Sequence, residues 1–430
     1  MVEKPIVPRY KLTEIGEIPA EWKLGTLTSV TENENDIVAG PFGSNLKVSD
    51  YTNAGVPIIR LQNVAPNSFI FKDIKYIGEE KAKELNYHSF IAGDIVLAKL
   101  GDPIGVSCVI PPELPHGIVV ADVVRIRVSD KKVDKHFIVQ SLNSSICLQQ
   151  LRLAKIGSTR PRVNLSDVRN IKLILPAFQE QKKIAEILSD TDSLIESLDL
   201  LISKKKNIKQ GLMQSLLTRG IGHTKFKMTE IGEIPEEWKI QKIKDISESL
   251  QYGYTQRAIS SPIGPKFLRI TDIKDGVVLW RNVPYCICPD DLFEKYALKR
   301  GDILFARTGA TTGKSYLVKE CPRALFASYL IRLRLKKTVV PSYLYSFFNS
   351  LIYWRQIEKN SMGSAQGGIN ANTLSKILSP MPRFEEQQKI AEILSDADKE
   401  IEALEQKRDK YKLLKTGMMQ QLLTGRIRVK

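Results

Sequence analysis

The sequence predicts an α+β protein of two similar mixed domains of strands and helices, related by an internal repeat and separated by two long antiparallel helices that form a coiled coil. The repeat is visible in the 430 residues themselves. Each copy contains short β-branched and aliphatic runs between turn residues, which are typical of strands, and then a segment with a seven-residue apolar period. We therefore expect a first mixed domain, a first long helix, a second mixed domain, and a second long helix with the C-terminal tail, over residues 1–178, 179–221, 222–384 and 385–430.

The internal repeat has nearly identical borders and divergent interiors. Two border segments recur: KLTEIGEIPAEWK at 11–23 as KMTEIGEIPEEWK at 227–239, and QKKIAEILSDTD at 181–192 as QQKIAEILSDAD at 387–398. The offset falls from 216 (227 − 11) to 206 (387 − 181), so the second interior is ten residues shorter. Weaker matches join the interiors: AGDIVLAKLG at 92–101 with RGDILFARTG at 300–309, and VVRIRV at 123–128 with LIRLRL at 330–335. Two copies of one plan with unlike loops predict two versions of one task.

The segment that ends each copy predicts a long helix. From Glu180 to Thr218 and from Glu386 to Thr424 there is no proline, and single glycines interrupt good helix formers. Apolar residues recur there every seven positions, as Ile390, Ala397, Leu404, Tyr411 and Met418 beside Ile393, Leu394, Ile401, Leu414 and Leu422, and as Ile184, Leu198 and Leu212 beside Leu188, Ile195, Ile202 and Leu216. Each helix would be roughly 60 Å long. Two matched seams in one chain favour pairing with each other over pairing with a second chain.

Two basic residues interrupt these seams. Lys205 occupies a seam position, and Arg408 lies near it. Their charges either extend to solvent along aliphatic stems or mark a part of each helix that faces another protein.

The charge of the chain indicates an acidic partner. Its formal net charge is +16 and its pI is near 9.4, which favours nucleic acid. A basic protein with many solvated lysines is the alternative. Five cysteines without a framework spacing and four scattered histidines argue against disulfides and against a metal site. Because there is neither an apolar run of membrane-spanning length nor a signal peptide, we expect a cytoplasmic protein without membrane contact.

The stretch RTGATTGKS at 307–315 looks like a phosphate-binding loop, which makes a nucleotide-binding protein an alternative. That loop needs four residues between its first glycine and the Gly-Lys pair, but only three follow Gly309 here. The equivalent KLGDPIGVS at 99–107 has Val106 in place of Lys314. We therefore interpret the stretch as a tight connection between two strands, in which Lys99 and Arg307 keep a positive charge and Lys314 can meet a DNA phosphate.

The order of these motifs resembles that of the specificity subunits of type I restriction-modification enzymes. The resemblance covers nearly the whole chain. It is carried by QxxIAEILSxxD and QxLLT in both helical segments, by the EIGEIPxEWK borders, by GDIL, and by the loops GPFGSNLK and QYGYTQ. No single motif is strongly specific, but their doubled order is.

The resemblance implies a DNA-reading subunit without catalysis of its own. In that family, each recognition domain reads one half of a bipartite target in double-stranded DNA, and the paired helices set the spacing and dock two modification (methyltransferase) subunits. Any S-adenosylmethionine would then be bound by the modification subunits, and ATP and Mg by restriction (motor and nuclease) subunits that can join. The chain itself would hold no cofactor. It also lacks the DPPY or NPPF quartet of an adenine methyltransferase. A basic coiled-coil scaffold remains the other alternative.

Residues for DNA contact are expected where strands end in loops. Lysine and arginine would meet phosphates, and paired donors and acceptors would meet base edges. For the first domain the candidates are Ser44, Asn45, Lys47, Arg60, Gln62, Asn63, Lys99, Arg160 and Arg162; for the second they are Tyr252, Tyr254, Thr255, Gln256, Arg269, Thr271, Asp272, Arg307, Lys314, Ser364 and Gln366. The alternative interpretation is that Asn, Ser and Gly in these loops only form turns.

Two pairs of residues repeat in both copies and therefore predict shared roles. Arg60 and Arg269 follow equivalent strands, so we expect a phosphate contact or a buried ion pair rather than sequence reading. Asp94 and Asp302 stand in the repeated GD motif, and we expect them to tie a turn rather than to hold magnesium.

Overall fold

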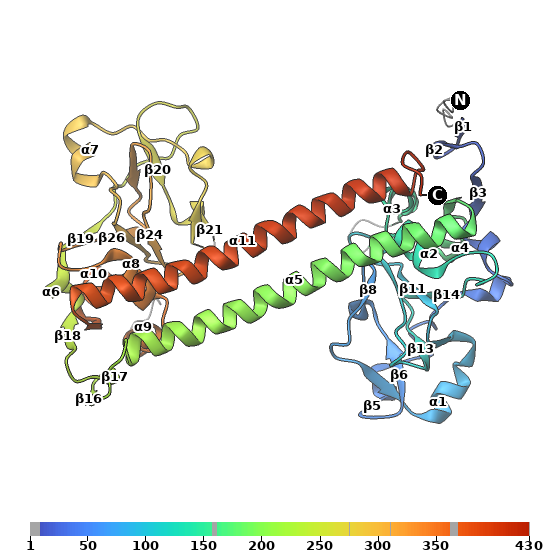
Figure 1. The fold of residues 1–430 in the computed structure, drawn as a ribbon, viewed down its shortest axis with the longest axis horizontal. Coiled ribbons are helices and arrows are strands. Elements are labelled where there is room, and N and C mark those ends of the chain that lie inside the picture. The colour runs from blue at the N-terminus through green and yellow to red at the C-terminus, as the bar shows by residue number, and fades with distance from the viewer. Residues whose placement is uncertain (1–8, 157–160, 275, 310, 362–368, 430) are drawn as a thin grey trace, which may run out of the picture. The chain divides into compact units, whose positions relative to one another are not determined.

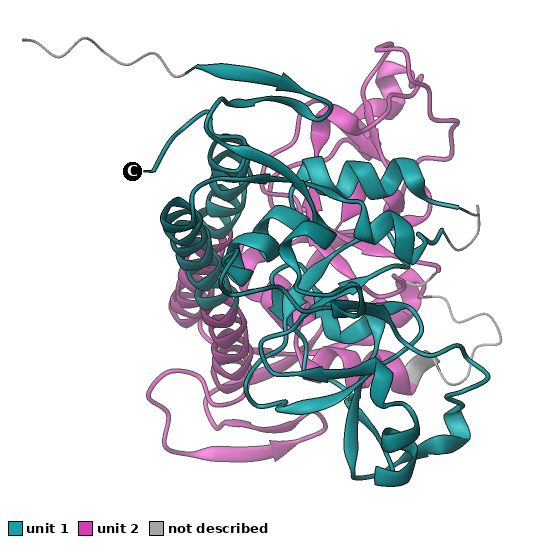
Figure 2. Ribbon diagram, turned by 90° about the vertical axis from the view of Figure 1, so that its right-hand side faces the viewer, with its two compact units in different colours: residues 1–199, 406–430 teal, residues 200–405 magenta. Residues whose placement is uncertain are grey.

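The computed structural model describes residues 9–156, 161–274, 276–309, 311–361 and 369–429. The chain divides into two compact units (Figure 2): unit 1 comprises residues 1–199 and 406–430, and unit 2 comprises residues 200–405. The division cuts through two long helices, α5 (Phe178–Thr218) and α11 (Phe384–Leu422). Each unit therefore contains one mixed domain and one half of each long helix.

Unit 1 is built around two sheets. The first is antiparallel, in the order β12-β11-β14-β4, from strands Ser107–Val109, Ile95–Ala98, Val123–Ile126 and Ile37–Ala39. The second is mixed, in the order β10-β13-β6-β9-β5, from Ser89–Ile91, His116–Val119, Val56–Ile59, Lys75–Ile77 and Tyr51–Thr52. Three two-stranded pairs accompany them: β1 (Tyr10–Thr13) with β2 (Gly16–Pro19), β3 (Lys23–Thr26) with β15 (Lys172–Leu175), and β7 (Val64–Ala65) with β8 (Ser68–Phe69). Strands β11 and β14 are buried along their whole length, and their sequences are apolar except for Arg125 in β14.

The described part of unit 1 has four short α-helices, of which the first packs against the second sheet and the other three against the core of the first sheet. They are α1 (Glu79–Glu84), α2 (Lys135–Leu142), α3 (Ser145–Ala154) and α4 (Leu165–Arg169). Asp134 accepts a hydrogen bond from the Phe137 N–H and so starts α2, and Ser144 starts α3 in the same way. Both side chains satisfy a backbone donor that has no partner inside its helix.

Unit 2 repeats this plan with a second set of elements. Its main sheet is antiparallel, in the order β19-β26-β23-β24, from Ser247–Tyr252, Leu330–Leu335, Ile303–Ala306 and Ser315–Leu317. Its strand pairs are β16 (Phe226–Thr229) with β17 (Gly232–Pro235), β18 (Lys239–Lys242) with β27 (Leu378–Met381), β20 (Lys266–Leu268) with β25 (Ala324–Phe326), and β21 (Ile273–Lys274) with β22 (Val277–Val278). Its shorter helices are α6 (Ile243–Ile246), α7 (Asp290–Tyr296), α8 (Pro341–Phe348), α9 (Leu351–Ser361) and α10 (Ala371–Lys376).

The strand registers confirm that the two units share one fold. Leu97 lies opposite Val124 in unit 1, and their counterparts Phe305 and Ile331 lie opposite each other in unit 2. A parallel pair also recurs, β6 with β13 in unit 1 and β20 with β25 in unit 2. The interior matches that the sequence shows only faintly therefore mark equivalent strands.

Each unit closes its core around a buried tryptophan. Trp22 is 1% exposed, and its indole N–H donates to Glu180 at 3.2 Å. Trp238 is also 1% exposed and donates to Glu386 at 3.0 Å. Both carboxylates lie in the first turn of a long helix, so the repeated EW and E-Q motifs fasten each mixed domain to its helix.

The long helices run in opposite directions along each other, as Figure 1 shows. They have 41 and 39 residues. In unit 1, Asp192 pairs with Lys415, and Asp199, seven residues later, pairs with Arg408, seven residues earlier. This crossed order is that of an antiparallel pair. The predicted fold class is confirmed, and α5 begins at Phe178 and ends at Thr218, against a predicted span of 179–221.

The seam between the helices is partly as predicted. The following predicted seam residues are buried: Ile184, Leu188, Leu198, Ile202, Leu216, Ile390, Leu394, Ile401 and Leu422. Ile393 and Leu414, by contrast, are 38% and 50% exposed, so their inclusion was wrong. Lys205 and Arg408 pair across the helices with Glu400 at 2.6 Å and Asp199 at 3.2 Å. This pairing inside the chain is a third outcome beside the two that the sequence left open.

Candidate nucleic-acid interface

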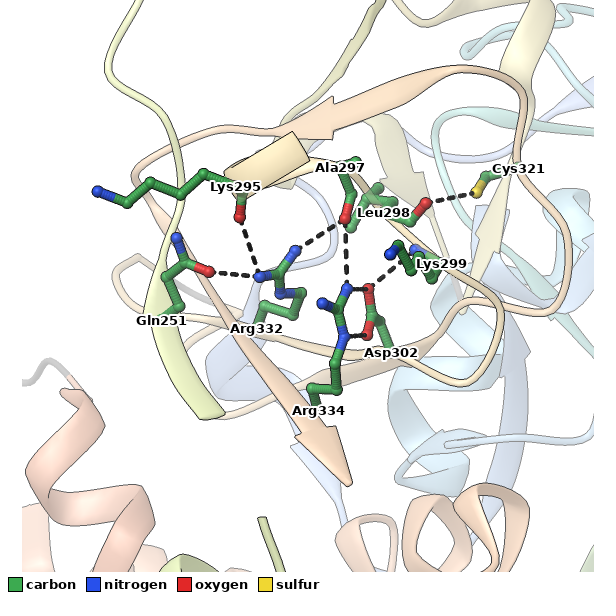
Figure 3. Close-up of polar contacts among 9 residues, drawn as sticks. All are labelled: Gln251, Lys295, Ala297, Leu298, Lys299, Asp302, Cys321, Arg332 and Arg334. Atoms are coloured by element: carbon green, nitrogen blue, oxygen red, sulfur yellow. Dashed lines mark hydrogen bonds and ion pairs between the residues drawn. The ribbon is translucent and has the colours of Figure 1, made fainter. Parts of the chain in front are cut away.

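Two arginines repeat at the equivalent strands: Arg125 in β14 with Arg127 directly after it, and Arg332 and Arg334 in β26. In each unit the second arginine binds an aspartate. Arg127 Nε and Nη2 lie 2.9 and 2.7 Å from the carboxylate oxygens of Asp94. Arg334 holds Asp302 with two bonds of 2.8 Å (Figure 3). Each aspartate also accepts a backbone N–H three residues earlier in the chain, at 2.9 Å. The predicted turn-tying role of Asp94 and Asp302 is therefore confirmed, and the ion pair was not foreseen.

The first arginine of each strand is a buried cation. Arg332 is 2% exposed, and its guanidinium donates to the carbonyls of Ala297 and Lys295 at 2.8 and 3.2 Å and to the side chain of Gln251 (Figure 3). Burial lowers the pKa of Arg332 to about 10, so it stays protonated at neutral pH. Because a buried charge is costly without partners, these three oxygens join β19 and the C-terminal end of α7 to β26. Gln251 directly precedes Tyr252, a predicted contact residue.

Arg125 takes the same place in unit 1 but has a different partner. It is 4% exposed and donates to the backbone carbonyl of Asn35. The residue opposite it on β4 is Val38, whose side chain cannot accept a hydrogen bond, whereas Gln251 lies opposite Arg332. The two equivalent arginines thus fix different segments next to the strand that leads into a predicted contact loop.

At one end of each main sheet, equivalent backbone bonds gather predicted residues. In unit 1 the Lys99 N–H donates to the Asp122 carbonyl at 3.0 Å, and the Val163 N–H donates to the Lys99 carbonyl at 3.2 Å. In unit 2 the Arg307 N–H donates to the Tyr329 carbonyl at 3.1 Å, and the Ile369 N–H donates to the Arg307 carbonyl at 2.9 Å. We call Lys99, Asp122 and Arg162 the strand-end cluster of unit 1, and Tyr252, Arg307 and Tyr329 the strand-end cluster of unit 2.

The strand-end cluster of unit 1 is charged. Arg162 Nε and Nη2 lie 3.2 and 3.3 Å from the carboxylate oxygens of Asp122, and the Arg162 side chain is 53% exposed. Burial lowers the pKa of Lys99, with Arg162 acting in the same direction and Asp122 against it. A carboxylate between two cations therefore orients an exposed guanidinium without removing it from solvent.

The strand-end cluster of unit 2 is aromatic. The Arg307 guanidinium lies 4.7 Å from the centroid of the Tyr252 ring and donates to the Ser328 carbonyl at 3.3 Å. The Tyr252 hydroxyl accepts the Ala371 N–H at 3.0 Å. Tyr329 is 62% exposed. Stacking on an aromatic face takes the orienting role that a carboxylate has in unit 1.

Arg60 and Arg269 form local ion pairs. Arg60 Nη2 lies 2.8 Å from Asp73, which also binds Lys75 at 2.7 Å and Gln62 at 3.1 Å. Hydrogen bonds from Lys75 and Arg60 hold the pKa of Asp73 well below its ordinary value. In unit 2, Arg269 pairs with Asp272 at 2.8 Å. An ion pair is thus their shared role, although the two arginine side chains are 20% and 42% exposed and so are not buried.

Asn63 must be removed from the set of contact residues. It is fully buried, accepts the Arg60 N–H at 3.0 Å and donates to the carbonyls of Ile70 and Lys72. Its amide therefore holds the turn that contains the short helix η4 (Leu61–Asn63), and it has no surface to offer a base.

The remaining predicted residues lie mostly at the surface. Exposed side chains in both units are those of Ser44, Asn45, Lys47, Gln62, Thr255, Gln256, Thr271 and Lys314. Tyr254 is half-buried, with its ring 5.3 Å from that of Tyr296. Arg160, Ser364 and Gln366 lie outside the described residues.

Strands β23 and β24, which flank the stretch RTGATTGKS, form a hairpin. Strand β23 ends at Ala306, β24 begins at Ser315, and Ala306 and Lys314 bond across the turn at 3.0 Å. Its equivalent joins β11 to β12 by the matching bond from Ala98 to Val106. A phosphate-binding loop leads into a helix instead, so the alternative interpretation of this stretch as such a loop was wrong.

Sequence reasoning missed four functional candidates: Asp122, Tyr329, Arg125 and Arg332. The match of VVRIRV with LIRLRL places Asp122 and Tyr329 at the same position before equivalent strands. That alignment could have identified them, because it pairs unlike side chains on one backbone. Among the described ranges no group of three or more His, Cys, Asp or Glu side chains is arranged to hold a metal, and no helix there is long and apolar enough to cross a membrane.

Comparison with known proteins identifies the family. The family model described as "Type I restriction modification DNA specificity domain" matches residues 19–209 and 235–412. The type I restriction enzyme MjaVIII specificity subunit of Methanocaldococcus jannaschii is 31% identical over 323 residues, 73% of this chain and 75% of that one. The EcoKI specificity subunit of Escherichia coli K12 is 22% identical over 398 residues, 87% and 82% of the two chains.

A solved structure shows the same fold. The crystal structure of the type I restriction-modification S subunit from M. genitalium covers 97% of this chain and 99% of that one, with a TM-score of 0.56 and 15% identity. The family match spans both mixed domains and most of both long helices. The chain therefore belongs to the specificity subunits of type I restriction-modification enzymes, which are non-catalytic and give DNA sequence specificity through two target-recognition domains.

Proposed function

We propose that unit 1 and unit 2 each read one half of a bipartite target in double-stranded DNA through their strand-end clusters. The observation that carries this proposal is the difference between the two clusters. Equivalent backbone bonds at Lys99 and Arg307 present a charged cluster in one unit and an aromatic cluster in the other. Unlike side chains on one framework are what two readers of unlike half-sites require.

Affinity in this proposal comes from cations at the same loops. Lys47 and Lys314 are exposed on the loops after β4 and β23, where they suit phosphate contacts. Arg162 and Arg307 have oriented guanidinium groups, which suit the two acceptors of guanine in the major groove. The other exposed predicted residues, Ser44, Asn45, Thr255, Gln256 and Thr271, add donors and acceptors. Arg160 and Gln366 stay predictions outside the described residues.

The long helices would set the unread gap between the half-sites. A helix of 41 residues is about 60 Å long, which is somewhat under two duplex turns of about 34 Å each. Ion pairs between the helices, such as Lys205 with Glu400 and Lys415 with Asp192, support a rigid pair. Rigidity is what a spacer needs in order to fix one gap length.

The same helices would dock two modification subunits. In unit 2, Leu200 and Ile208 of α5 are 67% and 53% exposed, and in unit 1, Leu413 and Leu414 of α11 are 75% and 50% exposed. Exposed leucine and isoleucine side chains on a paired helix suit an apolar protein surface. S-adenosylmethionine would then belong to the modification subunits, and ATP and Mg to restriction subunits that join them.

Mapping of methylated adenines tests this function. The full chain would be expressed with a matching modification subunit in cells that lack other adenine methylation, and the methylated positions would be read across the genome. We expect one motif of two unlike halves separated by a fixed gap. Absence of sequence-dependent methylation would contradict the proposal. The double variant Leu413→Gln with Leu414→Gln should abolish methylation while leaving DNA binding by the purified chain unchanged.

Binding of the purified chain to duplex DNA distinguishes a DNA-reading subunit from the alternative of a basic coiled-coil scaffold. Neutralising several phosphates releases counterions, so the affinity should fall steeply as salt rises. Affinity that stays flat between low and high salt would instead favour a basic scaffold with no DNA site.

A further inference from the structure

The residue that precedes the arginine-bearing strand differs between the units, and the difference would affect which half-site each unit recognises. It is Asp122 before β14 and Tyr329 before β26. Resting on the proposed reading of one half-site by each unit, we propose that this position determines specificity. Asp122 acts as a positioning residue for Arg162, and Tyr329 contacts a base edge directly.

The backbone at this position is the same in both units. The carbonyls of Asp122 and Tyr329 accept the N–H of Lys99 and Arg307 at 3.0 and 3.1 Å. Just after them, Val123 and Leu330 donate to carbonyls three residues earlier, each at 2.9 Å. Main-chain hydrogen bonds therefore hold the backbone at this position, so the side chain can differ between the units without changing the fold.

In unit 1 the side chain acts through its neighbour. The Asp122 carboxylate is 24% exposed and binds the Nε side of Arg162, with both contacts between 3.2 and 3.3 Å. This leaves the Nη1 amino group and the outer edge of the guanidinium toward solvent. An arginine held in this way presents two parallel donors, which match the O6 and N7 acceptors of guanine.

The Asp122 carboxylate also disfavours binding to DNA of the wrong sequence. Its negative charge repels the phosphate backbone, so its presence weakens binding to DNA of any sequence unless a correct base engages Arg162. Removing the charge should therefore raise affinity for unrelated DNA while it lowers discrimination. A residue that only stabilises the fold would lower both.

In unit 2 the side chain offers an aromatic surface. Tyr329 is 62% exposed, although a tyrosine buries large apolar area readily. The neighbouring Arg307 is already oriented by Tyr252 and by the Ser328 carbonyl, so it needs no carboxylate. An exposed ring beside an oriented guanidinium fits an apolar contact with a thymine methyl group next to a guanine.

The ion pair of Asp122 with Arg162 contributes little to the stability of unit 1, so a variant that removes it should still fold. More than half of the Arg162 side chain is exposed, and exposed ion pairs add little to stability. Asp122→Asn keeps the size of the side chain. Glu14→Gln is the matched control, because Glu14 is a carboxylate of unit 1 that pairs with Lys172.

The experiment combines methylation mapping with binding by the full chain. Asp122→Asn should relax the preference at one base pair of a single half-site by roughly tenfold and raise affinity for scrambled duplex DNA. Tyr329→Ala should relax one base pair of the other half-site only, and Tyr329→Phe should keep the wild-type motif because the ring remains. Glu14→Gln should change neither half-site.

The outcomes separate this inference from the proposed function. A wild-type chain that directs no bipartite motif contradicts the proposed function itself. A bipartite wild-type motif that stays unchanged in Asp122→Asn or in Tyr329→Ala overturns the assignment for that unit. Equal loss at both half-sites also contradicts it, since a specificity position acts on one half-site alone.

Discussion

Arg428 holds Glu180 by two parallel hydrogen bonds, from Nε to Oε1 at 2.7 Å and from Nη2 to Oε2 at 2.8 Å. The segment after α11 is thereby fastened to the first turn of α5 within unit 1. In unit 2 the equivalent carboxylate, Glu386, has His223 Nε2 at 2.9 Å. The two copies join their long helices to their domains at the same place with different basic side chains.

Loss of Arg428 should destabilise unit 1 in a pH-dependent way. Burial raises the pKa of Glu180, but the hydrogen bonds and charge of Arg428, together with hydrogen bonds from Trp22 and Val429, outweigh it, so the net pKa lies below the ordinary value of 4.5. Such a carboxylate stabilises the fold above pH 4.5, and this contribution is lost as the pH falls through the folded-state pKa. Arg428→Gln should lower the free energy of unfolding by about 3 kcal/mol near pH 7.

Thermal melting of the wild type and the variant between about pH 7 and pH 3 checks this linkage. The difference in melting temperature between the wild type and Arg428→Gln should become smaller below pH 4.5, the ordinary carboxyl pKa. Arg426→Gln, a change of the exposed arginine two residues earlier, is the control and should shift melting little. A gap that stays constant with pH would contradict the assigned role.

The cross-strand contact of Gln251 with Arg332 should stabilise unit 2. Gln251→Val introduces the residue type that unit 1 has opposite Arg125. Because it leaves a buried guanidinium with one partner fewer, it should cost about 1–3 kcal/mol. The check is a double-mutant cycle with Arg332→Met, measured by denaturant unfolding. Costs that simply add would show that the two side chains do not interact.

Much of the fold could be predicted because its signals are local. The seven-residue period, the absence of proline and the repeated borders suffice for α5, α11 and the two mixed domains. The error at Leu414 arose because the period alone does not tell which apolar stripe faces the partner helix.

The site could be predicted less well, because its partners are distant in sequence. Arg60 and Gln62 converge on Asp73, more than ten residues away, so the loop pattern could not show that these side chains are already engaged. Asn63 has the right chemistry for a base, yet burial decides its role. Lys99 and Arg162, however, were both selected from sequence and do meet in the structure through Asp122.

Lys314 should contribute affinity without specificity. It is exposed on the hairpin between β23 and β24, and unit 1 has Val106 at the equivalent position. Lys314→Gln should weaken DNA binding for all sequences alike and reduce the salt slope of log K by about one. Titration of duplex DNA over a salt series measures both quantities. A change in the methylated motif would instead make Lys314 a base-reading residue.

The length of α5 and α11 should set the gap between half-sites. Insertion of seven residues in each helix preserves the seam period and adds about 10 Å, which corresponds to about three base pairs. We expect unchanged half-sites with a longer gap in the methylation map. Insertion in α5 alone is the control, because it breaks the register of the pair and should abolish activity. An unchanged gap would refute the spacer role.

The central claim is that each mixed domain reads one half-site by itself. It is tested by replacing residues 229–384 with a second copy of residues 13–178, joined at Thr13/Thr229 and Phe178/Phe384, where the two copies match. Methylated adenines would then be mapped with the same modification subunit. The account predicts a motif whose two halves are the same sequence, that of the unit 1 half-site. A motif that keeps the original unlike halves would contradict it.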